Sequence, residues 1–185
     1  MRKLLTMTVG LMLAASAQAI DVAGVNIPDK ASVGAQELVL NGAGIRTRAI
    51  FKVYVGSLYV PAKANTAAAV LGKAPRRVQL NMLRDVSSDQ MLDALTEGVN
   101  QANSPADAGA VKPQMGELAQ VLKSIGQLKE GNVLAFDFVD GGTRVSLNGQ
   151  AKGTIAGEAF NKALFNAWIG DKPVQDDLKK AMLGG

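Results

Sequence analysis

Short stretches in which apolar and polar side chains alternate occupy much of the first half of the chain. Alternation with a period of two is typical of β-strands that bury one face. In one stretch Val78, Leu80 and Met82 lie on one side and polar side chains on the other, which predicts a strand with one wet face. The pattern, punctuated by glycine and proline, predicts strands over 20–22 with 25–27, 37–40, 45–60 and 76–83.

Two helices are predicted in the middle of the chain. Ser87 and Gln90 have the spacing of a capping box, and apolar residues then recur at helical intervals until Pro105. A second apolar stripe has Pro113 in its first turn and ends at Gly126. We expect both helices to lie over a sheet.

The last third of the chain is predicted to return to strands and then to helices. Asp140-Gly141 and Asn148-Gly149 are turn sequences between alternating stretches at 134–138, 143–147 and 151–155, as in an antiparallel meander. Helical spacing follows over 160–168 and again from Pro173. This order of elements predicts an α+β fold whose mostly antiparallel sheet is covered on one face.

Residues 1–19 are predicted to be a secretory signal peptide. Met1-Arg2-Lys3 is a basic start, an apolar run covers 4–15, and Ala17-Gln18-Ala19 is a small-residue cleavage site. The apolar run is shorter than the roughly 20 residues that cross a bilayer, so we expect no membrane span in the mature chain. The sequence therefore predicts an exported, periplasmic protein with a single domain over 20–185.

Composition limits the chemistry, because the chain has neither histidine nor cysteine. Catalytic triads and dyads that use these residues, zinc sites of the usual nitrogen and sulfur type, and disulfides are excluded. Haem held by histidine and iron–sulfur clusters are excluded as well, and we expect no cofactor. Arginine, lysine, tyrosine, hydroxyl and carboxylate groups are left to do any chemistry.

The charge of the chain does not favour nucleic-acid binding. Without the two basic residues of the leader, 18 Lys and Arg remain against 16 Asp and Glu, a net charge of +2. The adjacent basic pairs Arg76-Arg77 and Lys179-Lys180 are not interleaved with the aromatic residues that single-strand binding uses. We therefore expect no nucleic-acid partner.

The stretch that begins at Gly42-Ala43-Gly44 carries the candidate chemistry. Its two glycines allow the backbone to approach a neighbour closely, and a guanidinium follows them. On an unbroken strand, evenly spaced residues share one face. Here these residues are Arg46, Arg48, Lys52 and Tyr54. Three cations and a phenol could hold a carboxylate or an enolate, and a solvated sheet face is the alternative.

Helical stripes supply apolar side chains that would either line a cleft or fill a core. They are Met91, Leu95, Val99, Leu164, Ala167 and Trp168. We interpret Trp168 as a plug of the core between sheet and helices, and Asp137 as an outward-facing strand residue. The four-residue spacing of Asp89, Asp93 and Glu97 indicates a solvated helix surface rather than a metal site.

These motifs resemble those of the chalcone isomerase superfamily, and in particular its bacterial secreted, chalcone isomerase-like branch. The resemblance rests on Gly-Ala-Gly-x-Arg at 42–46, the aromatic strand at 51–60, Ala-Trp-Ile-Gly-Asp-Lys-Pro-Val at 167–174 and Asp-Leu-Lys at 177–179. It covers essentially all of the mature chain. The resemblance implies an open-faced β-sandwich, in which an apolar cleft separates a large antiparallel sheet from a layer of helices.

The functional positions of the superfamily are only partly present. Arg46 matches the arginine that guides and polarises the substrate in plant isomerases, and Tyr54 falls where they have a strand threonine. Met91, Gly98 and Ala167 fall where they have a tyrosine, an asparagine and a late threonine or serine. These three residues cannot orient a polar flavanone or hold a catalytic water, whereas they suit an apolar cleft.

The superfamily also contains plastid fatty-acid-binding members, in which an arginine and a tyrosine hold the carboxylate, and Arg46 with Tyr54 resembles that arrangement. We therefore expect a non-catalytic protein that binds a fatty acid or similar apolar carboxylate. The ligand-binding residues expected from the strand and the helices are Arg46, Tyr54, Arg48, Met91, Leu95 and Ala167.

Two alternatives to a binding protein remain from the sequence. One is an isomerase or intramolecular lyase acting on an enone, with Arg46 as electrophile and Tyr54 as proton donor. The other is a periplasmic interaction protein without a small ligand, in which Met91, Leu95 and Trp168 fill the cleft. The sequence leaves the oligomeric state open.

Overall fold

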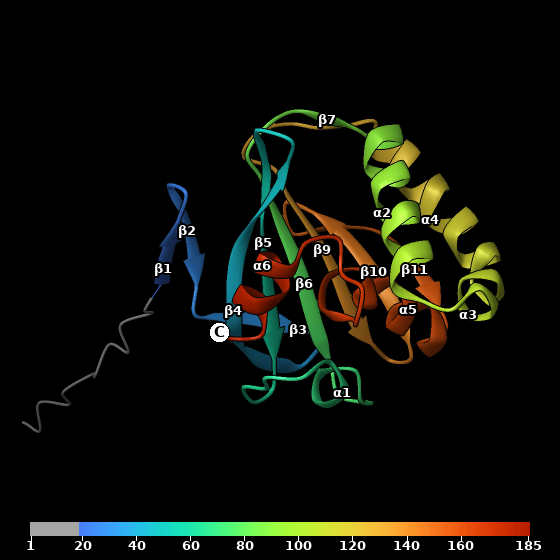
Figure 1. Cartoon of the computed structure of the whole chain (residues 1–185), viewed down its shortest axis with the longest axis horizontal. Helices are drawn as coiled ribbons and strands as arrows, with labels where there is room; N and C mark the ends of the chain where they lie inside the picture. The colour runs from blue at the N-terminus through green and yellow to red at the C-terminus, as the bar shows by residue number, and fades with distance from the viewer. Residues whose placement is uncertain (1–18) are drawn as a thin grey trace, which may run out of the picture.

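The computed structural model describes residues 19–185, so the predicted leader lies outside the described residues except for Ala19. Its largest element is a seven-stranded antiparallel sheet in the order β11-β10-β9-β6-β5-β4-β3 (Figure 1). The strands of this sheet are β3 (Lys30–Val33), β4 (Gln36–Arg48), β5 (Phe51–Val60), β6 (Arg76–Met82), β9 (Val133–Val139), β10 (Gly142–Leu147) and β11 (Gln150–Ala156). Two small sheets pair β1 (Ala19–Val22) with β2 (Val25–Pro28), and β7 (Val86–Ser87) with β8 (Gln127–Leu128).

The helices of the described residues are α1 (Ala67–Val70), α2 (Ser88–Ala102), α3 (Pro105–Ala110), α4 (Lys112–Ile125), α5 (Glu158–Ile169) and α6 (Asp176–Met182). The sequence predicts α2, α4, α5 and α6, whereas the short helices α1 and α3 were not predicted. The capping box of α2 is formed, because Gln90 N donates to Ser87 Oγ at 3.1 Å and Ser87 N donates to Gln90 Oε1 at 3.0 Å. Among residues 19–185, every helix is too short or too polar to cross a membrane.

The helices form a layer on one face of the sheet, so the predicted α+β architecture is confirmed (Figure 1). The central helix is α5, which contacts β10 and is buried along most of its length, with Phe160, Leu164 and Trp168 at most 1% exposed. Helix α4 contacts β11, and α2 packs mainly against α5 and α4. The main apolar core therefore lies between the sheet and α5.

The opposite face of the sheet is also covered at one end, where the sheet curls and the β1–β2 hairpin lies beside it (Figure 1). A second apolar cluster forms there from Ile27, Val33, Leu38, Leu40, Val55 and Tyr59. The Tyr59 hydroxyl donates to the Pro28 carbonyl oxygen at 3.0 Å and fastens this hairpin to β5. Burial on both faces is the reason why period-two alternation is incomplete in these strands.

The prediction of an outward-facing Asp137 is wrong, because this residue is only 1% exposed. The polar face predicted on β6 is present but half-buried, since Arg77 and Asn81 keep partial exposure and Gln79 is 9% exposed. Arg77 on β6 and Arg144 on β10 lie directly opposite Asp137 on β9, and they donate to its carboxylate at 2.6 and 2.9 Å. Two guanidiniums in register satisfy the buried carboxylate. Alternation along one strand does not reveal such partners, because they come from neighbouring strands.

The single long strand predicted over 45–60 is in fact a hairpin. β4 and β5 are joined by a turn at Ala49 and Ile50, and Ala49 has a φ of 53°. Glycine or asparagine usually occupies this left-handed conformation, so the sequence contains no turn signal at this point. The hairpin places Arg46 directly opposite Tyr54, whereas Lys52 is paired with Thr47.

Helix α6 lies on the glycines of β4. A Cβ atom at Gly42 would overlap the carbonyl oxygen of Ala181, and one at Gly44 would lie 2.7 Å from the Ala181 Cβ. The side-chain amide of Asn41, which is 4% exposed, donates to the Met182 carbonyl oxygen at 2.7 Å and fastens the end of the helix to the strand. The Gly-Ala-Gly segment therefore provides a seat for the C-terminal helix.

Because this seat has no room for a side chain, Gly44→Ala is expected to destabilise the protein by about 1–3 kcal/mol, the usual range for overpacking. Gly116→Ala is the matched control, since Gly116 is exposed in α4 and no atom lies within 4 Å of the place that its Cβ would take. Gly116→Ala is expected to raise the free energy of unfolding by up to about 1 kcal/mol, because alanine has a higher helix propensity than glycine. Urea unfolding monitored by Trp168 fluorescence measures both changes, and a Gly44→Ala protein as stable as the wild type would contradict the account.

Candidate functional site

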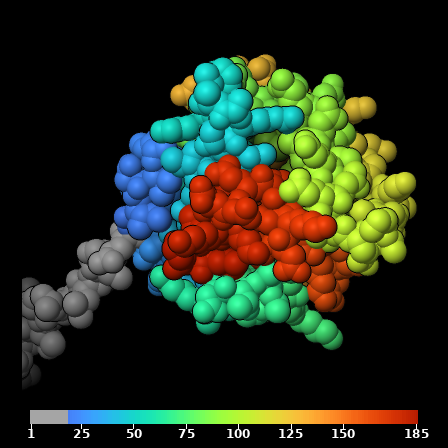
Figure 2. Space-filling view, viewed as in Figure 1, coloured from blue at the N-terminus to red at the C-terminus, as the bar shows by residue number. Residues whose placement is uncertain are grey.

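A cleft of about 540 Å³ lies between the β4–β5 hairpin, α2 and the end of α5. Figure 2 shows the hairpin (cyan), α2 (green) and α6 (red) meeting on one face of the molecule. The six residues that the sequence singles out all line this cleft: Arg46, Arg48, Tyr54, Met91, Leu95 and Ala167. They come from four separate elements, so only the folded chain brings them together.

Arg46 and Tyr54 are cross-strand partners in the β4–β5 hairpin. Residues directly opposite each other in an antiparallel pair project from the same face, with their Cβ atoms about 5 Å apart. Tyr54 is 7% exposed, and Arg46 is half-buried. The guanidinium and the phenol therefore enter the cleft side by side.

The Tyr54 hydroxyl is fixed by the lone tryptophan. Trp168 Nε1 donates to the Tyr54 hydroxyl oxygen at 3.0 Å, while the indole ring packs at 5.9 Å from the Phe136 ring. Trp168 therefore fills the core as predicted, and it also positions a candidate site residue, which the sequence does not indicate. Burial raises the pKa of the Tyr54 phenol, although the Trp168 hydrogen bond and the Arg46 charge lower it in part. The phenol thus stays protonated at neutral pH and can donate a hydrogen bond.

Gln175, at the start of α6, holds the Arg46 side chain and was not identified from the sequence. Its Oε1 accepts from the Thr47 backbone N–H at 2.9 Å and from Arg46 Nη1 at 3.3 Å, and its Nε2 donates to the Ile45 carbonyl oxygen at 3.1 Å. Arg46 Nη1 also donates to the Thr47 carbonyl oxygen at 2.7 Å. One amide thereby connects α6 to β4 and orients the guanidinium. A lone glutamine in a polar stretch carries no pattern that predicts this role.

The walls of the cleft are apolar. Met91 and Leu95 project from α2 and Ala167 from α5, and each is at most 4% exposed. The cleft remains open beside Met91, Leu95 and Trp168, which argues against an interaction protein whose cleft these side chains fill. At Gly98, a Cβ atom would lie 2.9 Å from both the Ala167 Cβ and the Val174 Cγ1. The helices thus meet too closely here for the polar side chain that plant isomerases have.

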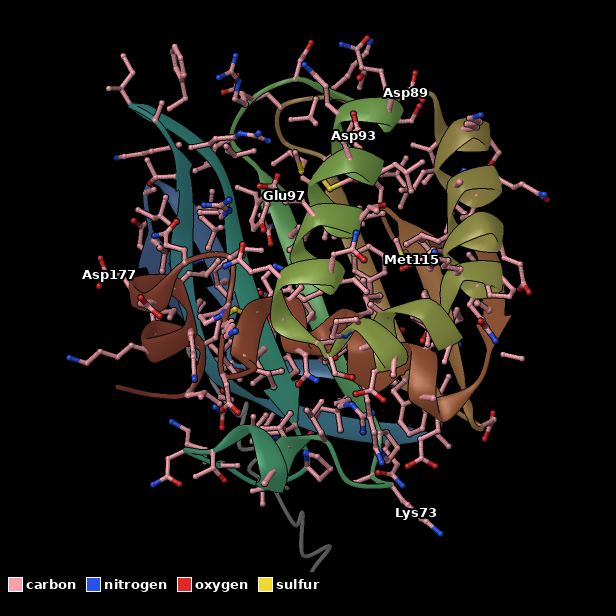
Figure 3. The ribbon with its side chains drawn as sticks, turned by 45° about the vertical axis from the view of Figure 1, so that its right-hand side comes forward. Lys73, Asp89, Asp93, Glu97, Met115 and Asp177 are labelled. Carbon is pink, nitrogen blue, oxygen red and sulfur yellow. The ribbon has the colours of Figure 1, made fainter. Side chains whose placement is uncertain are left out.

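Charged residues surround the mouth of the cleft. Arg48, two-thirds exposed, lies on the hairpin and faces Glu97 of α2 at 3.9 Å. Figure 3 shows Asp89, Asp93 and Glu97 along α2, all of them solvent-exposed as the sequence predicts. An ion pair between two exposed side chains at this distance contributes little free energy. The rim is therefore polar and adaptable, while the interior holds the fixed donors.

The arrangement is suited to binding an anion with an apolar tail. Among residues 19–185, Arg46 forms no ion pair with a carboxylate, and no hydrogen bond donated by the Tyr54 hydroxyl is found. Both groups are donors that can point at one acceptor, and water is largely excluded around Tyr54. In such an environment a charge-assisted hydrogen bond is stronger than it is in water.

Both tyrosines of the chain, Tyr54 and Tyr59, have a pKa that burial raises above the ordinary value of 10.0. Above pH 10.0 the unfolded chain loses phenolic protons that the folded chain keeps, so the free energy of unfolding is expected to fall as the pH rises past this point. Below pH 10.0 both states keep these protons, and the two tyrosines do not make stability depend on pH. Tyrosinate absorbance of Tyr59→Phe, in which Tyr54 is the remaining tyrosine, measures the shift. Equal midpoints in native and urea-unfolded protein would contradict it.

Comparisons with known proteins agree with the geometry. The fold is similar to that of a fatty-acid binding protein from Arabidopsis thaliana, AtFAP1, with a TM-score of 0.73 and 13% sequence identity over 90% of this chain and 96% of that chain. No curated protein has a significantly similar sequence. The sequence profile of the chalcone isomerase-like family matches residues 19–184, almost the whole of the described chain. This chain therefore belongs to the chalcone isomerase-like family.

Proposed function

We propose that the protein binds a fatty acid or a similar apolar carboxylate without transforming it. The observation that carries the proposal is the pairing of Arg46 with Tyr54 at the wall of an apolar cleft, where each side chain keeps a donor that has no hydrogen-bond partner among residues 19–185. The carboxylate head accepts hydrogen bonds from both, and the tail lies along Met91 and Leu95. A binding function is also supported by the shared fold with a protein that binds fatty acids.

The head group is selected by charge and by geometry. A guanidinium presents parallel N–H donors that match a carboxylate, and Gln175 and Thr47 engage only one of its terminal nitrogens, Nη1. The Tyr54 hydroxyl already accepts a hydrogen bond from Trp168, so its own proton is the group available to a ligand. An alcohol or an ester presents neither the charge nor the two equivalent oxygens.

The tail is selected by burial of apolar area. The volume of about 540 Å³ falls within the roughly 300–1,000 Å³ of small-molecule sites. Each buried methylene contributes about 0.8 kcal/mol, so affinity is expected to rise with chain length until the cleft is full. Longer chains then extend past the rim, and the affinity no longer increases.

Arg46→Ala is expected to weaken dodecanoate binding by about 1.5–3 kcal/mol, the contribution of a hydrogen bond to a charged group. Arg46→Lys keeps the positive charge but loses the parallel N–H donors of the guanidinium, so its dodecanoate affinity is expected to lie between those of the wild type and Arg46→Ala. The measurement is calorimetric titration of delipidated protein with dodecanoate and with dodecanol. The wild type should prefer the carboxylate, and Arg46→Ala should lose that preference while still binding the tail.

Arg48→Ala is the matched comparison, because its side chain is two-thirds exposed at the rim and its effect should be smaller. Absence of saturable binding by the wild type for any saturated acid from octanoate to palmitate would refute the proposal. An equal loss of dodecanoate and dodecanol affinity in Arg46→Ala would refute the placement of the head group.

A further inference from the structure

The turn of the β4–β5 hairpin exposes two adjacent large apolar side chains. Ile50 is 86% exposed and Phe51 is 53% exposed, and the remaining exposed large hydrophobic residue of the described chain is Ile20. The tip of the hairpin lies at the upper end of the molecule in Figures 1 and 2, beside the segment that contains β7. Ala49 and Phe51 also line the cleft, so this tip stands at its mouth.

Cations surround this apolar tip. Arg48 precedes it and Lys52 follows it directly in the sequence, and both are exposed. The guanidinium of Arg84 lies 4.6 Å from the centre of the Phe51 ring and covers one face of it. An apolar point within a collar of arginine and lysine is the composition of segments that enter the boundary between headgroups and acyl chains of an anionic bilayer.

Acidic residues lie on the other side of the cleft and limit how a negatively charged surface can approach. Asp89, Asp93 and Glu97 are exposed along α2, and Asp85 precedes that helix (Figure 3). They would be repelled by an anionic surface, whereas the hairpin would be attracted to it. Glu97 also faces Arg48 at 3.9 Å. The charges therefore favour contact centred on Ile50, Phe51 and Lys52 of the hairpin, with α2 turned away.

We propose that the hairpin tip, Ile50 and Phe51 with the cations Arg48, Lys52 and Arg84, docks on an anionic phospholipid bilayer. A bilayer is favoured over a protein partner because two side chains cannot supply the roughly 800 Å² that each partner of a stable protein interface buries. Insertion of a bulky apolar tip into lipid needs no such area. If the cleft binds acyl carboxylates, as proposed above, docking brings its mouth to the membrane and lets the ligand exchange there.

The absence of cysteine from the chain allows a probe to be placed at one position. Ala49→Cys keeps Ile50 and Phe51 in place and carries an environment-sensitive fluorophore at the tip. Lys73→Cys is the matched control, because Lys73 is exposed at the opposite end of the molecule (Figure 3). The protein is purified from cells, its N-terminus is established by intact mass, and it is mixed with vesicles of equal parts phosphatidylcholine and phosphatidylglycerol. The fluorescence emission of the probe at residue 49 should shift to shorter wavelength when vesicles are added, and that of the probe at residue 73 should not.

Vesicle flotation then separates the apolar and the electrostatic contributions. Ile50→Ser/Phe51→Ser is expected to weaken binding more than tenfold, since it removes the inserted area. Arg48→Gln/Lys52→Gln is expected to weaken it about fivefold for each charge removed, an effect that added salt also produces. Lys73→Gln should bind as the wild type does. Dodecanoate titration of Ile50→Ser in solution should be unchanged, because Ile50 is 86% exposed and does not line the cleft, and this separates the docking proposal from the function of the cleft.

Several results would overturn the docking proposal. Vesicle binding by Ile50→Ser/Phe51→Ser equal to that of the wild type, or equal shifts of both probes, would place the contact elsewhere on the molecule. Lack of wild-type binding to the anionic vesicles would exclude a bilayer as the occupant. A dimer in sedimentation that Ile50→Ser/Phe51→Ser dissociates would assign the tip to an interface between two copies of the chain.

Discussion

The structure depends on the close contact between α6 and β4, two elements more than a hundred residues apart in sequence. The glycines of β4 leave space for the helix, and polar side chains tie both ends of it to the strand. Gln175 connects its start to Ile45 and Thr47, and Asn41 connects its end to Met182. Because Gln175 also bonds to Arg46, the contact that completes the core also orients the candidate ligand-binding group.

The same principle of a fixed donor on an apolar background holds for the rest of the cleft. The Tyr54 phenol is held by Trp168, whose ring is itself fixed between Phe136 and Phe165. A donor that is oriented before the ligand arrives loses little conformational entropy on binding, and this favours affinity. Exposed charges at the rim, by contrast, are free to rearrange. The fold thus combines a rigid polar point inside with an adaptable entrance.

Local signals predicted the parts of the fold whose determinants are close in sequence. The capping box at Ser87 and the Asp-Gly and Asn-Gly turns, whose Asp140 and Asn148 have φ near 50°, are each decided within a few residues. The short strand β3 was not predicted, since its four residues alternate too briefly to be recognised. The turn at Ala49 was missed because its left-handed backbone has no glycine or asparagine to announce it.

The sequence predicted which residues line the candidate site, but not which residues hold them in position. The family resemblance led to Arg46 and Tyr54, whereas the argument from even spacing along one unbroken strand was wrong, because the two residues meet as cross-strand partners in a hairpin. Gln175, the Trp168 hydrogen bond and the burial of Asp137 depend on long-range partners, which a single sequence does not show. The family and the fold are confirmed, whereas the role of the six site residues, the leader and the periplasmic location remain predictions.

The central claim is that Arg46 and Tyr54 hold a carboxylate in its charged form. The measurement that tests it most directly is a pH titration, by NMR, of dodecanoate labelled with a carbon isotope at its carboxyl group and bound to the protein. A neighbouring guanidinium and a phenolic donor favour the ionised form, so the pKa of the bound carboxyl group should lie below that of the free acid and rise in Arg46→Ala. A bound pKa equal to or above that of the free acid, and unchanged in Arg46→Ala, would contradict the account.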